Sequence, residues 1–145
     1  MTTTIAQYYK VELFDWNNSI RFYTREIAEL GNKLADVIRR DSIVGIAKKV
    51  EGHQSLLNYS AGKFHDLQLA IKQQAALLKK SEFPALDHST ENETERKRNE
   101  LRSMMQATVK EYIDANFNCY HFLSEIIKKN YGKRNILPEL WYAPG

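Results

Sequence analysis

Cysteine, proline and glycine are scarce in this sequence. It contains one cysteine, Cys119, so no disulfide can form within the chain. The three prolines are Pro84, Pro138 and Pro144, which leaves three long segments without a proline. There are also only six glycines. This composition disfavours a β fold rich in turns and favours long helices.

Long apolar runs and a strong excess of one charge are also missing. No segment approaches the roughly 20 consecutive apolar residues of a membrane span. The first ten residues have no basic stretch followed by an apolar one, as a secretory signal would. The formal net charge is only +3, which gives little support to nucleic-acid binding. Because 43% of the residues are apolar and 27% are charged, we expect one globular, cytoplasmic domain over residues 1–145.

Apolar residues recur in steps of three and four, which is the spacing of one helix face. The first such row is Leu13, Trp16, Ile20, Tyr23, Ile27, Leu30, Leu34 and Val37. A mean step of 3.5 residues is typical of helices that pack along their length, as in a coiled coil. We predict helices over about 15–40, 42–80 and 90–130, with Asp15 as the N-cap of the first. The short connections favour antiparallel neighbours, so the predicted fold is an all-α, up-and-down bundle.

The second predicted helix contains three glycines, Gly45, Gly52 and Gly62. Each costs about 1 kcal/mol relative to alanine in a helix interior. At Gly52 and Gly62 we expect a neighbouring backbone to approach closely. The sequence does not decide whether Gly45 lies within the second helix or before its first residue.

The third predicted helix carries two adjoining apolar stripes from Leu101 onward. The second of them consists of Val109, Ile113, Asn116, Tyr120, Leu123 and Ile127. Together the two stripes cover about half of the helix surface, which is wider than the roughly 100° stripe of a surface helix. Such a helix needs neighbours on two sides.

The predicted lengths leave apolar surface to be covered. The first predicted helix spans about 40 Å, whereas the other two each span nearly 60 Å. The covering segment could be the N-terminal tail, the apolar C-terminal tail over 133–145, or a second copy of the chain. We predict a homodimer that completes the bundle to four or more helices. The residues expected to mediate this self-association are Val109, Ile113, Tyr120, Leu123, Ile127 and Trp141.

His53 is the most interesting titratable residue because it falls on the apolar stripe of the second predicted helix. A buried imidazole needs hydrogen-bond partners. One hypothesis is a small-ligand or metal-binding site that His53 shares with Tyr23 and Tyr112. The simpler hypothesis is a core histidine satisfied by a neighbouring hydroxyl, such as that of Thr108. No cofactor is predicted.

Other reactive residues have simpler explanations. No histidine has a glutamate three positions before it, as carboxylate-bridged metal bundles require. His121 and Glu125 are four residues apart, but they share the solvated face, which favours a surface ion pair. Cys119 lies on an apolar stripe and is expected to be a buried, inert thiol. With no phosphate loop or nucleophile elbow either, the sequence supplies no catalytic residue and no set of metal ligands, and it favours a protein that is not an enzyme over one that is.

Basic residues recur in pairs, which could contact the phosphates of a nucleic acid. Three of the pairs fall where a predicted helix ends, where they complement the helix dipole. Nucleic-acid binding is therefore an alternative of low weight. The pairs are Arg39–Arg40, Lys48–Lys49, Lys79–Lys80, Lys128–Lys129 and Lys133–Arg134.

The first two predicted helices resemble those of a group of small bacterial helical proteins. The residues that carry this resemblance are Trp16, Phe22–Tyr23, Glu26–Ile27, Val50–Glu51 and His65–Asp66–Leu67. That group has no assigned activity, so the resemblance implies a bundle fold and supplies no catalytic residue. It would place a histidine near position 52, where this chain has Gly52. The leading hypothesis is therefore a non-enzymatic, self-associating interaction or scaffold protein.

Overall fold

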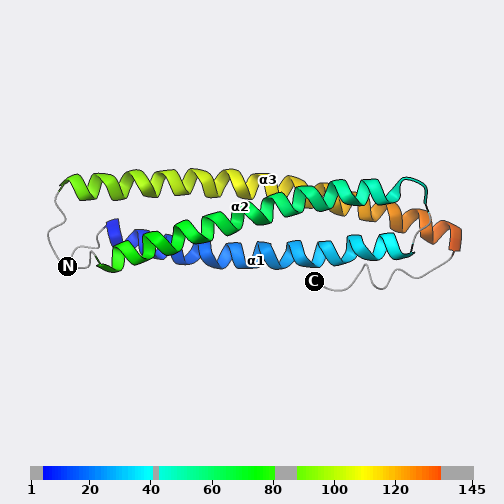
Figure 1. Cartoon of the computed structure of the whole chain (residues 1–145), viewed down its shortest axis with the longest axis horizontal. Coiled ribbons are helices and arrows are strands. Elements are labelled where there is room, and N and C mark those ends of the chain that lie inside the picture. The colour runs from blue at the N-terminus through cyan, green and yellow to red at the C-terminus, as the bar shows by residue number, and fades with distance from the viewer. Residues whose placement is uncertain (1–4, 41–42, 81–87, 135–145) are drawn as a thin grey trace.

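Three helices packed against one another make up the computed structural model of this chain (Figure 1). The structure describes residues 5–40, 43–80 and 88–134. Helix α1 is Ile5–Arg40, α2 is Ile46–Lys80 and α3 is His88–Arg134. No strand occurs in these three ranges. The prediction of an all-helical, bundle-like fold is confirmed.

The predicted start of the first helix at Asp15 is wrong, because α1 begins ten residues earlier at Ile5. The three-four spacing continues upstream through Ala6, Tyr9 and Leu13, and the Tyr9 and Leu13 side chains are buried in the core. At 36 residues, α1 spans about 54 Å and is as long as α2. The supposed N-terminal tail is therefore part of the bundle, and a short first helix no longer explains any exposed apolar surface.

Helix α2 is continuous through Gly52 and Gly62, and Gly45 lies in the turn before it. Gly45 has a φ of +82°, where an L side chain is strained. The expectation of close backbone approach at Gly52 and Gly62 is wrong. Both are exposed, and a Cβ atom at either position would lie more than 4 Å from every other described residue apart from the adjoining backbone of its own helix.

These glycines give a first prediction. Because Gly52 and Gly62 have helical backbone and open space, Gly52→Ala and Gly62→Ala should each raise the free energy of unfolding by about 0.5–1 kcal/mol. Gly45→Ala is the matched control, and should lower it by about 1 kcal/mol because of its positive φ. Urea denaturation followed by circular dichroism measures all three. A loss of stability in Gly52→Ala and Gly62→Ala would contradict the open environment described here.

The core is built in layers to which the helices contribute side chains at matching levels. Near one end, the Tyr9 hydroxyl of α1 donates a hydrogen bond to Gln74 Oε1 of α2 over 3.3 Å. Further along, the Gln68 amide lies 3.5 Å from Asn17 Oδ1. The buried apolar side chains are Tyr9, Leu13, Ile20, Ile27, Leu30, Leu34, Val37, Ile46, Val50, Leu57, Phe64, Leu67, Ile71, Leu78, Leu101, Met105, Tyr112, Ala115, Cys119, Leu123 and Ile126.

Ion pairs join the early turns of α3 to α1. Glu12 of α1 accepts hydrogen bonds from Arg98 Nε at 2.5 Å and from Arg102 at 2.9 Å. All three side chains are partly buried, so salt screens these ion pairs less than it screens pairs between fully exposed side chains. The first part of α3 is helical, and Arg98 joins it to α1.

Two sequence predictions lie outside the described residues. They are the C-terminal tail beyond Arg134 and the self-association role of Trp141. Within the described ranges, no helix is long and apolar enough to cross a membrane.

Candidate functional site

An aromatic layer joins all three helices near the middle of the bundle. The Tyr23 ring of α1 stacks on Phe64 of α2, with 5.4 Å between centroids. The Tyr112 ring of α3 lies 5.1 Å from Tyr23 and 5.8 Å from Phe64. Two of the three residues proposed as a ligand site, Tyr23 and Tyr112, are thus in direct contact. Phe64 fills the space that a ligand between them would need.

The hydroxyl of Tyr112 is fully engaged. It donates a hydrogen bond to Glu26 Oε1 over 2.5 Å and accepts one from Asn116 Nδ2 over 2.6 Å. Burial and the hydrogen bond to Glu26 raise the pKa of Tyr112 above its ordinary value. The phenol therefore keeps its proton at neutral pH, and its geometry joins α1 to α3 rather than presenting a base.

His53 lies in a different layer from the two tyrosines. Its ring stacks on Phe122 of α3, with 4.7 Å between centroids. Eleven residues of α2 separate it from Phe64, a distance of about 16 Å along the helix axis. His53 Nδ1 is buried and has no hydrogen-bond partner among the residues that the structure describes. The structure therefore brings Tyr23 and Tyr112 together but not His53, and a ligand role for the three stays a prediction.

The environment of His53 predicts a pH dependence of stability. Burial lowers the pKa of His53 below 6.5. The unfolded chain then binds a proton at this residue at a higher pH than the folded chain. Stability is therefore full above about pH 6.5 and falls as the pH drops from there toward the lowered native pKa.

His53→Leu removes this proton-binding difference. The variant should lose less stability than the wild type between pH 7.5 and pH 5, because its position 53 takes up no proton on unfolding. Urea titrations at several pH values in this range measure the difference. Equal losses in the two proteins would show that His53 is not the residue responsible.

Cys119 is buried in the core, and burial raises its pKa to about 11. The thiol is therefore protonated at neutral pH, which does not suit a nucleophile. Among the described residues, no group of three or more His, Cys, Asp or Glu side chains could hold a metal ion. His121 is exposed, as the sequence predicted.

Three basic pairs gather at one end of the bundle. Figure 1 shows the end of α1, the start of α2 and the end of α3 close together there. Two acidic residues offset part of this charge, because Asp36 pairs with Arg39 and Glu125 lies 3.6 Å from Lys128. Nucleic-acid binding stays a prediction. The basic residues at this end are Arg39, Arg40, Lys48, Lys49, Lys128 and Lys129.

The strongest candidate site is an apolar surface on α3. Ile113, Phe117 and Tyr120 are 54%, 71% and 45% exposed. Their steps of four and three residues hold them on one line along the helix. We call these three residues the α3 stripe. Lys33 Nζ of α1 lies 5.6 Å from the centre of the Tyr120 ring, so one edge of the stripe borders α1.

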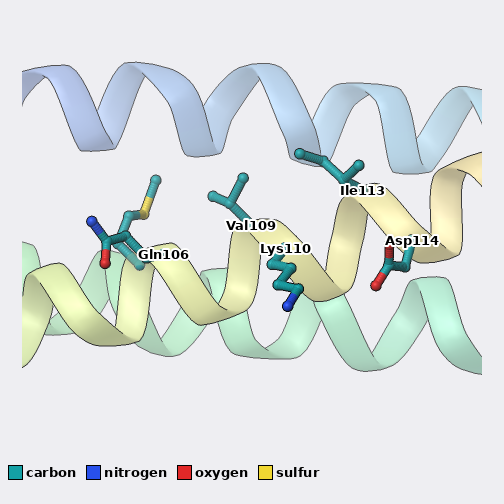
Figure 2. A pocket seen from close by; sticks show the side chains of 6 residues that line it. Gln106, Val109, Lys110, Ile113 and Asp114 are labelled. Carbon is teal, nitrogen blue, oxygen red and sulfur yellow. The ribbon is translucent and has the colours of Figure 1, made fainter.

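A shallow, open hollow of about 350 Å³ adjoins the stripe. In Figure 2, Val109 and Ile113 point from α3 toward α1, whereas Lys110 and Asp114 point away from α1. The floor is mostly apolar and the rim is charged. Its lining residues are Met105, Gln106, Val109, Lys110, Ile113 and Asp114.

The members of the second apolar stripe that the sequence predicts for α3 differ in burial. Leu123 is buried, Val109 and Ile127 are partly buried, and Ile113 and Tyr120 are exposed. Sequence reasoning missed Phe117, the most exposed of the α3 stripe. The signal was present, because Phe117 lies four residues after Ile113 and three before Tyr120.

Comparisons with known proteins give no relative for this chain. No protein-family model matches the sequence, and neither a curated protein nor a solved structure matches it. The resemblance to small bacterial helical proteins therefore gains no support from these comparisons. A function can therefore be inferred only from the residues of this chain.

Proposed function

We propose that this protein is a non-enzymatic helical-bundle interaction protein that associates with a second copy through α3. The observation that carries this proposal is the α3 stripe. Its three large apolar side chains are between 45% and 71% exposed on successive turns of one helix. A contiguous apolar surface of this kind marks an interaction site more often than isolated exposed residues do.

Another group of exposed apolar residues is less suited to helix docking. Tyr8, Val11 and Phe14 of α1 are exposed, but two steps of three residues spread them over about 120° of the helix surface. The steps of four and three in the α3 stripe keep its members within about 60°. A straight partner helix can therefore cover the α3 stripe along its whole length.

The α3 stripe is also continuous with the core. Leu123 is buried, and the partly buried Val109 borders the hollow. A helix seated on the stripe would extend the existing core rather than form a separate contact. This continuity supports the proposal of a bundle enlarged beyond three helices.

The proposal includes an up-and-down order of the three helices. Contacts between Tyr9 and Gln74 and between Tyr23 and Phe64 support opposite directions for α1 and α2. The contact between His53 and Phe122, with that between Lys63 and Glu111, supports the same relation for α2 and α3. In this order the α3 stripe borders α1, with which α3 runs in parallel.

The polar chemistry of the interior supports a structural role. Burial raises the pKa of both Tyr112 and Cys119, so both groups keep their protons at neutral pH. The α3 stripe supports association more strongly than any contact in the aromatic layer, or in the layer of His53, supports a bound ligand.

Sedimentation velocity tests the proposal. Between about 1 and about 100 μM, a range that covers Kd values typical of weak to moderate homodimers, the sedimenting mass should rise to twice the chain mass of 16.9 kDa. A mass of 16.9 kDa throughout would overturn the proposed self-association.

A further inference from the structure

We infer that two copies pair through α3 in an antiparallel, two-fold symmetric arrangement, with Phe117 of each copy against Tyr120 of the other. This inference rests on the self-association proposed above and specifies its geometry. It follows from the positions of the exposed side chains on α3 and from the rule that a two-fold interface must be complementary to itself.

The spacing of the α3 stripe sets the register. When two helices pack along a three-four row in opposite directions, a residue at one type of core position faces a residue at the other type. Phe117 and Tyr120 are adjacent members of the row and are both exposed. A two-fold axis at the level between residues 118 and 119 places each Phe117 opposite Tyr120 of the second copy. Two aromatic pairs then lie at the centre of the interface.

The same register brings an acidic side chain of one copy and a histidine of the other together beside the aromatic pairs. Asp114 and His121 are both exposed, and they lie seven residues apart on the same side of the stripe. Neither makes a hydrogen bond or ion pair with any other described residue. In the two-fold pair, Asp114 lies level with residue 123 of the second copy, two positions or about 3 Å along the axis from that copy's His121. The two side chains can therefore meet at the edge of the interface, and this contact occurs twice. A parallel two-fold pairing would instead place the Asp114 and His121 residues of the two copies on opposite edges of the interface, so that neither would gain this partner.

The register also supplies an occupant for the hollow. The axis between residues 118 and 119 brings Ile127 of one copy to the level of Lys110 on the other. Lys110 is on the rim of the hollow, beside Val109 and Ile113. Ile127 is partly buried within its own chain, so part of its side chain is available to a second copy. An apolar side chain therefore faces the apolar floor at both ends of the interface.

A charge exchange tests the arrangement. Asp114→Lys places an ammonium opposite His121, and His121→Asp places a second carboxylate opposite Asp114. Each variant alone should weaken the homodimer by roughly three- to tenfold in Kd, because each altered contact occurs twice. Asp66→Lys is the matched control. Asp66 is exposed on α2. Its replacement by lysine changes the net charge as much as Asp114→Lys does but should leave the Kd of the homodimer unchanged.

Mixing the two weakened variants gives the decisive result. In an Asp114→Lys/His121→Asp heterodimer, one contact pairs lysine with aspartate and the other is the native Asp114–His121 pair. The mixture should therefore associate at least as tightly as the wild type. Sedimentation velocity of the separate and mixed proteins measures this, and their thermal melts confirm that each remains folded.

The other outcomes overturn different statements. A dimeric wild type whose affinity is unchanged by either variant, or whose variants do not recover when mixed, would overturn the antiparallel arrangement and leave the self-association intact. A wild type that stays monomeric would overturn both.

Discussion

Replacing Phe64 with alanine should lower the free energy of unfolding by about 3–5 kcal/mol, the cost of removing a fully buried aromatic side chain. Phe64 has no exposed surface. It stacks on Tyr23 and meets Tyr112 edge to face, so α1 and α3 both lose their contact with α2 in this layer. A cavity at this position therefore loosens all three helices at once.

Two further variants make the measurement specific. Phe64→Leu keeps most of the side-chain volume and should cost less than half as much as Phe64→Ala. Leu69→Ala, on the same helix at a residue 47% exposed, should stay within about 0.5 kcal/mol of the wild type. Urea denaturation measures all three. A loss below about 1 kcal/mol for Phe64→Ala would show that the aromatic layer does not hold the helices together.

The second large effect is on association. Phe117→Glu should weaken the homodimer roughly 30- to 1,000-fold, which is the range seen when a central aromatic anchor is removed. The variant loses two aromatic pairs and places a carboxylate against each Tyr120. Because Phe117 is 71% exposed in the single chain, the substitution should leave the fold of the monomer intact.

Leu69→Glu is the control for Phe117→Glu. It introduces the same charge in place of an exposed apolar residue, but on α2 and away from the α3 stripe. Its sedimentation should match that of the wild type at every concentration. If Leu69→Glu weakened association as much as Phe117→Glu, the interface would not be confined to α3.

The sequence predicts three helices because the rows of apolar residues in steps of three and four are unbroken. It misplaces the start of α1, because Asp15 is a suitable N-cap and the upstream row through Tyr9 is short. It also misjudges Gly52 and Gly62. A glycine on a helix surface and a glycine against a neighbouring backbone look alike until the neighbouring chain is placed.

The site could be predicted only in part. The sequence indicates that α3 has more apolar surface than one neighbour covers, and Ile113 and Tyr120 are exposed as that view requires. Which edge of the surface α1 covers depends on how the helices are rotated, and this is why Phe117 was missed. The separation of His53 from Tyr23 depends on the level at which α2 packs, and side-chain spacing within one helix does not determine that level.

The central claim is that a second copy covers the α3 stripe, and the reactivity of a thiol at position 113 tests it most directly. Cys119 is buried with a pKa of about 11, so the native thiol reacts slowly and an Ile113→Cys variant reports on the stripe alone. The maleimide is kept at one concentration, in excess over the protein in every sample. Labelling of the thiol at position 113 should then be fast at about 1 μM protein and strongly slowed at about 100 μM. A Leu69→Cys control should react at the same rate at both protein concentrations. Equal labelling rates at position 113, at concentrations where the protein is dimeric, would contradict the account.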